Sequence, residues 1–348
     1  MADKLRCVLV GCGSVSRAWL DALRDMSDVE VVGLVDINED AARARQEQYQ
    51  LFSAVVDTDL RSILKRLQPD IVFDCTVPSA HADVTITALE NGCHVLGEKP
   101  LADSLENALR MIDAAKKAGK VYAVMQNRRY DTNIRSLRQF LASGTIGDLT
   151  TLHSDFFIGA HFDGFRSKMK HVLLLDMAIH TFDQARLISG ADPISVYCKE
   201  WNPKGSWYDD GASAVCIFEM SNGIVYTYRG SWCAEGLNTT WESSWRCIGE
   251  RGTVVWNGAD EFRAQRVVES GGFISRLEDV EVPINATEKS GRHAGLIRDF
   301  VDCIKSGKTP ETICTDNIKS LAMVFAAIES AESGKPVELI SLGIQLSR

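Results

Sequence analysis

The stretch Leu5-Arg-Cys-Val-Leu-Val-Gly-Cys-Gly-Ser-Val-Ser16 decides the fold of this chain. Its apolar first half is typical of a buried strand, and a helical pattern follows its glycine-bearing second half. Gly11 allows a tight turn, and Gly13 lets the backbone approach a pyrophosphate. Ser14 and Val15 lie at the start of the helix, where amide donors and a positive dipole end favour a phosphate. The stretch therefore predicts the opening of a dinucleotide-binding α/β domain.

A carboxylate further along the chain strengthens this prediction. Asp36 ends a second β-branched, apolar run at residues 29–35, about 20 residues beyond the glycines, where it would accept the ribose hydroxyls of adenosine. It would also repel a 2′-phosphate, so NAD is favoured over NADP. The third glycine of the fingerprint is replaced by Ser16, a small residue. The alternative is a ligand-free turn with a solvent-exposed Asp36.

The order of strand and helix signals predicts two domains. Over the first third of the chain the signals alternate with short connections, which indicates right-handed crossovers and a doubly wound parallel sheet. Beyond about residue 126, strand signals follow one another with glycine-bearing turns, as in an antiparallel sheet. We expect an NAD-binding Rossmann domain over residues 1–125 and an α+β domain with a large, mostly antiparallel open sheet over residues 126–348. Helices are expected at residues 133–142, 176–188, 293–305 and 317–329.

The tripeptide Glu98-Lys99-Pro100 follows the predicted strand at residues 94–97. The carboxyl ends of parallel strands form the edge at which open α/β sheets bind ligands. Pro100 restricts the backbone of Lys99 to extended conformations, so the lysine is expected to be rigidly held. Such a lysine beside a nicotinamide could hydrogen-bond a reacting hydroxyl. The tripeptide alone is more typical of a surface Glu-Lys pair that ends a strand.

Asp176 and His180 are four residues apart in a predicted helix and therefore share one of its faces. Their side chains could converge on one point or pair with each other. The opposite face, with Leu175, Ile179 and Phe182, is apolar and explains the helix as a packing element. From the spacing alone, Asp176 could simply stabilise the positive end of the helix, and His180 could be a core histidine.

Composition narrows the class of protein. The chain has 348 residues, of which 45% are hydrophobic and 24% charged, as in globular proteins with a large core. Its net charge of −9 repels nucleic acid and anionic lipid. No stretch is long and apolar enough to span a bilayer, and no apolar signal region opens the chain, so we expect a cytoplasmic protein. The ten cysteines include no pair two residues apart, so we expect reduced structural thiols and no metal site.

Taken together, the motifs resemble those of the glucose-fructose oxidoreductase, inositol dehydrogenase and rhizopine catabolism (Gfo/Idh/MocA) family. The resemblance covers nearly the whole chain and rests on Gly11-x-Gly13, Asp36, Thr76-Val-Pro78 with His81, Glu98-Lys99-Pro100, and Asp176-x-x-x-His180. The segment Asn127-Arg-Arg-Tyr-Asp131 is similar to one found in inositol dehydrogenases of this family. The chain departs from the family at Ser16 and at Leu173-Leu174, where many members have glycines.

The resemblance implies the fold above and a hydride transfer between nicotinamide and a secondary carbinol carbon of a sugar or cyclic polyol. Lys99 would bind the reacting oxygen, His180 would act as general acid and base, and Asp176 would orient the substrate. The cofactor contacts it implies, beside the glycine turn and Asp36, are Thr76, Pro78, His81, Glu98 and Lys99. The expected substrate contacts are Lys99, Asn127, Arg128, Arg166, Asp176 and His180. As an alternative, Arg166 belongs to a solvated basic loop.

Three functions remain open from the sequence. The leading one is an NAD(H)-dependent sugar, keto-sugar or inositol oxidoreductase. The others are a glycoside-cleaving enzyme that uses bound NAD for transient oxidation, and a non-catalytic dinucleotide-sensing regulator. A sheet that is apolar on its uncovered face needs a partner, so we expect a homodimer or homotetramer built through the C-terminal sheet.

Overall fold

A computed structural model describes residues 4–287 and 289–343. The chain forms two compact units, of which the first comprises residues up to 127 together with 291–318 and the second comprises 128–290 together with the residues from 319 on. The first unit therefore includes residues 291–318, whereas the sequence-based division assigns them to the second domain. Helix α8 (His293–Ser306) packs on the first helix of this unit, and its Arg298 donates to Asp28 at 2.8 Å.

The first unit is a six-stranded parallel sheet with the strand order β3-β2-β1-β4-β5-β6. Its elements are β1 (Leu5–Val10), α1 (Ser16–Arg24), β2 (Val29–Val35), α2 (Glu39–Gln48), β3 (Val55–Asp57), α3 (Leu60–Leu67), β4 (Ile71–Asp74), α4 (Pro78–Glu90), β5 (His94–Gly97), α5 (Leu105–Ala118) and β6 (Tyr122–Val124). The doubly wound fold predicted from the sequence is confirmed. The strand order reverses between β1 and β4, and ligands of such sheets bind in the crevice at this point.

The second unit contains a nine-stranded sheet with the order β14-β13-β12-β11-β7-β10-β9-β8-β15. Its strands are β7 (Leu149–Phe157), β8 (Pro193–Trp201), β9 (Ser213–Met220), β10 (Val225–Ser231), β11 (Ser244–Gly249), β12 (Gly252–Trp256), β13 (Phe262–Glu269), β14 (Arg276–Val280) and β15 (Val337–Glu338). Only β7 and β10 pair in parallel; the other neighbouring strands in the described residues pair in antiparallel. The expected open, mostly antiparallel sheet is thus confirmed.

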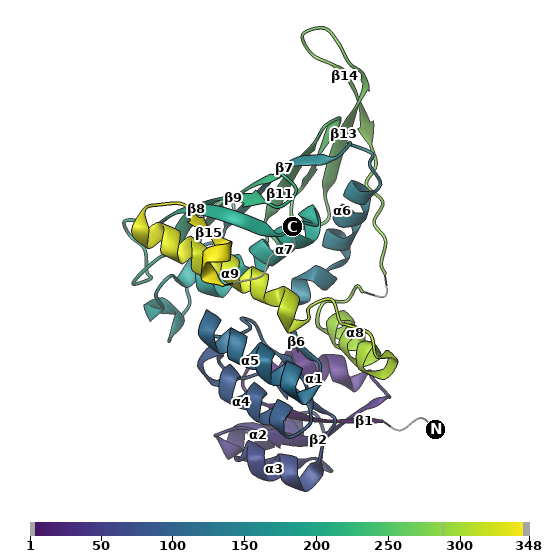
Figure 1. The fold of residues 1–348 in the computed structure, drawn as a ribbon, viewed down its shortest axis with the longest axis vertical. Helices are drawn as coiled ribbons and strands as arrows, with labels where there is room; N and C mark the ends of the chain where they lie inside the picture. Colours follow the sequence, from purple (N-terminus) through teal and green to yellow (C-terminus); the bar gives the residue numbers. More distant parts are fainter. Residues whose placement is uncertain (1–3, 288, 344–348) are drawn as a thin grey trace. The chain divides into compact units, whose positions relative to one another are not determined.

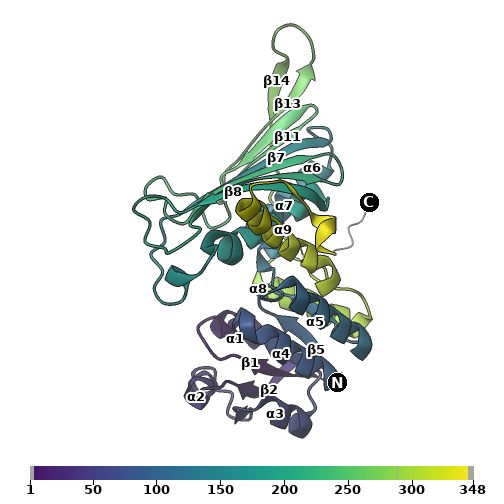
Figure 2. The ribbon, with the colours of Figure 1, turned by 60° about the vertical axis from the view of Figure 1, so that its left-hand side comes forward.

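Helices cover one face of this sheet (Figures 1 and 2). They are α6 (Thr132–Ala142), α7 (Ile179–Ser189) and the part of α9 (Cys314–Ser333) that belongs to this unit; the short segments are η1 (Asn127–Tyr130), η2 (Arg166–Lys168), η3 (Leu173–Ala178) and η4 (Leu339–Leu342). The alternation in β9 shows the two faces, since Cys216 and Phe218 are buried while Ile217 is exposed.

The helix that carries Asp176 begins earlier than the sequence pattern indicates. A π-helical turn, η3, spans Leu173–Ala178, and the α-helix proper, α7, starts only at Ile179. Leu173 and Leu174 are completely buried, so the two leucines that replace the family's glycines are core residues at the start of this turn. π-helical turns inside helices occur frequently at functional sites.

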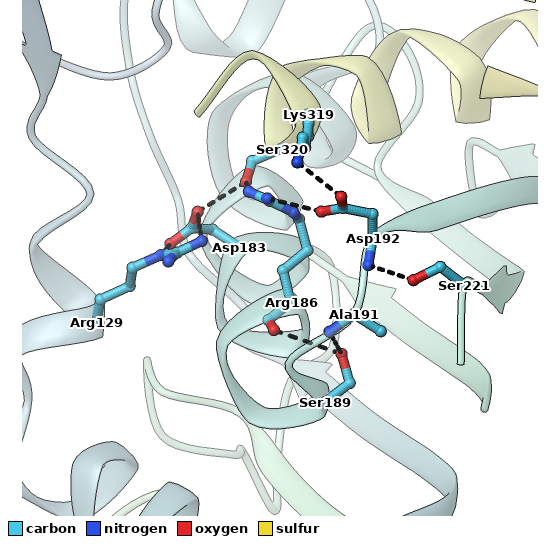
Figure 3. A network of polar contacts seen from close by, with 9 residues as sticks. All are labelled: Arg129, Asp183, Arg186, Ser189, Ala191, Asp192, Ser221, Lys319 and Ser320. Atoms are coloured by element: carbon cyan, nitrogen blue, oxygen red, sulfur yellow. Dashed lines mark hydrogen bonds and ion pairs between the residues drawn. The ribbon is translucent and has the colours of Figure 1, made fainter. Parts of the chain in front are cut away.

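A network of buried charges ties α7, β8 and α9 together (Figure 3). Arg129 donates to both carboxylate oxygens of Asp183 at 2.5 and 2.8 Å, and Ser320 donates to Asp183 at 2.7 Å. Arg186 and Lys319 donate to Asp192 at 3.1 and 2.6 Å. Burial alone would raise the pKa of Asp192, but these two cations hold that pKa below its ordinary value.

Candidate active site

The glycine turn after β1 has the shape that a dinucleotide requires. Gly11 has a φ of 89°, and a Cβ at this position would lie 2.7 Å from the backbone of Cys75, so only glycine fits there. A Cβ at Gly13 would meet nothing within 4 Å, which leaves open space in front of the turn. Ser14 and Val15 continue the turn into α1, as expected from the sequence.

Asp36 is fixed beside this turn by two backbone amides. Its Oδ2 accepts from the amide of Cys12 at 2.7 Å, and its Oδ1 accepts from the amide of Asn38 at 2.9 Å. Both bonds hold the carboxylate in place at the end of β2.

A cavity of about 820 Å³ opens where β1, β2 and β4 end. Of the predicted cofactor contacts, Gly11, Gly13, Asp36 and Thr76 line it. Ile37, which is 97% exposed, and Val77, which is 57% exposed, also line it. These exposed apolar side chains suit a flat apolar group, because burying them against one would remove apolar surface from water.

His81, predicted as a cofactor contact, is buried and belongs to a polar cluster within the sheet edge. Its Nδ1 lies 3.1 Å from Oδ2 of Asp74, which also accepts from Thr85 at 3.2 Å. Thr76 donates to the other oxygen of Asp74 at 2.6 Å. Burial alone would lower the pKa of His81, but Asp74 raises it above the ordinary value. His81 therefore contacts Thr76, which lines the cavity, and does not line the cavity itself.

Glu98 and Lys99 follow β5 at the same edge of the sheet. The carboxylate of Glu98 is buried and accepts the indole N–H of Trp19 at 2.7 Å and the backbone N–H of Lys99 at 3.1 Å. Burial raises the pKa of Glu98, although the hydrogen bond from Trp19 opposes this. Glu98 thus links α1, which follows the glycine turn, to the backbone of Lys99. The sequence gives no indication of this contact, because Trp19 lies 79 residues away.

In the second unit, the structure brings Asp176 and Arg166 together. Arg166 donates to Asp176 at 2.9 and 3.4 Å, and its guanidinium lies over the rings of Phe162 and Phe165. His180 lies in the first turn of α7 and is 7% exposed. The aspartate is therefore held by an ion pair at the π-helical turn, and Arg166 is an ordered part of this region.

Arg128 lies close to the same turn. Its Nη2 is 3.5 Å from the sulfur of Met177, which belongs to η3, and its Nη1 is 3.9 Å from the buried carboxylate of Glu242. Glu242 in turn accepts from Gln184 of α7 at 2.9 Å. Neither Glu242 nor Gln184 could be predicted from the sequence as part of this region, since a single acidic or amide residue in a loop or helix forms no pattern.

Asn127, the other expected substrate contact, belongs to the first unit. Its amide nitrogen lies 3.2 Å from Nδ1 of His293 at the start of α8. Burial, with a smaller effect of Arg292, lowers the pKa of His293 to about 4, so this imidazole is neutral at pH 7.

In the described part of the chain, no group of three or more histidine, cysteine or acidic residues is placed to hold a metal ion. No described helix is long and apolar enough to cross a membrane.

Comparison with known proteins agrees with this architecture. Residues 5–126 match the model of the oxidoreductase family with an NAD-binding Rossmann fold, and residues 134–255 match the GFO/IDH/MocA C-terminal domain. The D-apiose dehydrogenase of Paraburkholderia graminis is 25% identical, with 97% of this chain and 91% of that protein covered. The myo-inositol 2-dehydrogenase of Thermotoga maritima is 25% identical, with 96% and 98% covered.

A solved structure shows the same fold. It is that of an oxidoreductase from Agrobacterium radiobacter in complex with NAD+, L-tartaric acid and magnesium, with a TM-score of 0.84, 22% identity, and 97% of this chain and 99% of that chain covered. The parallel sheet with its glycine turn and the open antiparallel sheet each match a model of one family. The chain therefore belongs to the Gfo/Idh/MocA family of oxidoreductases and carries that family's NAD-binding Rossmann domain.

Proposed function

We propose that this protein is an NAD(H)-dependent oxidoreductase that transfers hydride between nicotinamide and a secondary alcohol or ketone of a sugar, keto-sugar or cyclic polyol. One observation carries the proposal. The cavity and Lys99 lie at the carboxyl edge of one sheet, where Glu98 N–H donates to the Asp74 carbonyl at 2.7 Å. The substrate class is supported by relatives that are sugar and polyol dehydrogenases.

The residues around the cavity fit a dinucleotide. Gly11 leaves no room for a side chain, Gly13 leaves open space, and Asp36 presents a fixed carboxylate. A fixed carboxylate accepts two ribose hydroxyls but repels a 2′-phosphate, which supports NAD over NADP. When bound, the nicotinamide ring supplies the hydride acceptor or donor.

The chain's own residues would handle the proton. Oxidation of a CH–OH carbon removes a hydride to nicotinamide and a proton from the hydroxyl, leaving a carbonyl. In the proposal, Lys99 donates a hydrogen bond to the reacting oxygen and His180 takes the proton. Imidazole suits this step, because its ordinary pKa lies close to neutral pH. Asp176, held by Arg166, orients the hydroxyls of the substrate.

The open face of the second sheet supports a second copy of the chain as partner. Tyr197, Ile217 and Val225 lie on this face and are each 40–44% exposed. Apolar side chains gathered on one face usually mark an interaction surface. We propose a homodimer or homotetramer built through it, which sedimentation of the purified protein would test.

The experiment that tests the function measures nicotinamide absorbance while the protein is incubated with NAD and a panel of inositols, aldoses and disaccharides. We expect NADH to form with one subset of the panel. The variant Lys99→Met should leave NADH binding largely intact and lose at least about 10²-fold in turnover, since the hydrogen bond to the reacting oxygen is lost. Lys117→Met, at an exposed lysine, is the matched control. Wild-type turnover in Lys99→Met would remove Lys99 from the mechanism.

Absence of NADH formation across the panel, with tight NADH binding, would favour a keto-sugar reductase, the glycoside-cleaving enzyme or the regulator. Turnover of a glycoside without net NADH formation would identify the glycoside-cleaving enzyme. Binding without any turnover, in either direction of the reaction, would identify a regulator.

A further inference from the structure

Arg45 of α2 is buried against the phosphate-binding turn. Its side chain reaches the turn with two donors, because Nη2 donates to the carbonyl of Gly13 at 2.9 Å and Nε donates to the hydroxyl of Ser16 at 3.0 Å. The hydroxyl of Ser16 itself donates to the Gly13 carbonyl at 2.7 Å. Arg45 is 9% exposed and Ser16 is completely buried. Arg45 from α2, Ser16 from α1 and Gly13 from the turn thus form a closed set of hydrogen bonds.

The positive charge of Arg45 has only neutral partners. Its third bond goes from Nη1 to the amide oxygen of Gln48 at 2.9 Å, so all three acceptors are uncharged. Among the described residues no carboxylate lies within ion-pair distance of it. A buried charge without a counter-charge is unfavourable, and buried arginines are usually paired for this reason. The field of this charge reaches the turn, since Arg45 opposes the rise in the pKa of Cys12, which burial and Asp36 bring to about 12.

A dinucleotide brings the missing counter-charge to this place. Its diphosphate is anionic, and in a fold of this kind it lies at the glycine turn and the helix N-terminus. The turn itself offers amide dipoles but no formal charge. A guanidinium directly behind the turn adds a full positive charge at short range in a poorly solvated environment, where charges interact strongly.

We propose that Arg45 is a positioning residue for the cofactor diphosphate, an inference that rests on the proposed function. Arg45 holds the Gly13 carbonyl away from the ligand, and its positive charge compensates the negative charge of the diphosphate across the turn. Ser16 belongs to the same hydrogen-bonded group. Its hydroxyl bridges Arg45 and Gly13, which accounts for a serine at the place of the third glycine. Arg45, Ser16 and Gly13 together favour the binding of a dinucleotide or another compound with an adenosine diphosphate moiety.

The test compares binding of three probes to the whole protein: NADH by direct titration, and ADP-ribose and adenosine by competition with NADH. The variant is Arg45→Gln. Its control is Arg43→Gln, which changes an exposed arginine of the same helix that pairs with Glu39. We expect Arg45→Gln to bind NADH and ADP-ribose about tenfold more weakly, a factor typical of one lost charge interaction. Adenosine, which lacks phosphate, should bind the variant and the wild type equally well, and Arg43→Gln should match the wild type for every probe.

A second variant separates charge from packing. Arg45→Lys keeps the charge but loses the planar fork, so its NADH affinity should lie between those of the wild type and Arg45→Gln. If the NADH affinity of Arg45→Lys is as low as that of Arg45→Gln, the positive charge makes no contribution and the proposal is overturned.

Two other results would also overturn it. If Arg45→Gln binds NADH within twofold of the wild type, the arginine does not serve the diphosphate. If it loses adenosine binding to the same degree as NADH binding, Arg45 only holds the turn in shape. A wild-type protein that binds neither NADH nor NADPH would overturn the proposed function itself, and the role of Arg45 with it.

Discussion

Arg45 in the first unit and Arg186 in the second are buried to a similar degree, at 9% and 6% exposure, yet their partners differ. Arg186 donates to the carboxylate of Asp192, and the neighbouring Arg129 is paired with Asp183 (Figure 3). Arg45 contacts three neutral oxygens. A buried cation that the chain compensates by itself serves the fold, whereas one left without a counter-charge is available to an anionic ligand. Substitutions in the two units test this difference.

The largest effect is expected when the compensated network loses a carboxylate. Asp183→Asn leaves Arg129 buried without its counter-charge, and breaking such a pair typically costs about 3–5 kcal/mol of unfolding free energy. Denaturant unfolding measures this loss. Glu39→Gln, which breaks an exposed pair with Arg43, is the control and should change stability by about 1 kcal/mol or less. Equal losses in the two variants would show that the network is not a structural charge cluster.

A smaller effect, on ligand choice, is expected at the carboxylate that faces the cavity. Asp36→Ala should lower the preference for NADH over NADPH about tenfold, since it removes the carboxylate that we propose repels a 2′-phosphate and accepts the ribose hydroxyls. Parallel titrations with the two nucleotides give the ratio. An unchanged ratio would mean that another residue reads this end of the cofactor.

The third prediction compares the stability effects of replacing Arg45 and Arg129. Without ligand, Arg45→Met should change the unfolding free energy by about 1 kcal/mol or less, because the variant loses hydrogen bonds and also removes an uncompensated charge. Arg129→Met should lower the unfolding free energy by about 3–5 kcal/mol, since it leaves the buried carboxylate of Asp183 without its cation. Comparable losses would contradict the distinction between the two environments.

The smallest effect is a pH dependence of stability from the Asp74–His81 pair. The pKa of His81 is raised in the folded protein, so its contribution is complete below the unfolded value of about 6.5 and is lost as pH rises through the folded value. The wild type should therefore lose more stability than His81→Gln between pH 6 and pH 8.5. Parallel curves in denaturant unfolding would show that this pair does not titrate in that range.

The local patterns of the sequence predict more of the fold than of the site. The glycine turn and Asp36 could be predicted because their roles depend on a short strand-turn-helix segment. The contacts of Arg45 could not, since its bond to Gly13 spans 32 residues and depends on how α2 docks. The bond between Trp19 and Glu98 depends on packing in the same way.

The second unit shows a different reason for a missed feature. A helical pattern is visible around Asp176, but hydrophobic periodicity cannot tell a π-helical turn from an α-helical one over six residues. The ion pair between Arg166 and Asp176 joins a loop to that turn. The roles of Lys99, Asp176 and His180 remain predictions that rest on family resemblance.

The exposed side chain of Ile37 has a consequence for the protein's lifetime. Together with Val77 it leaves apolar surface in water next to the cavity whenever the nucleotide is absent. A ligand that covers this surface and binds only the folded chain stabilises it by about 2.7 kcal/mol at a hundredfold excess over its dissociation constant. Resistance to proteolysis and shelf life should therefore follow the supply of nucleotide, and a cell that runs short of it would hold less of the intact protein.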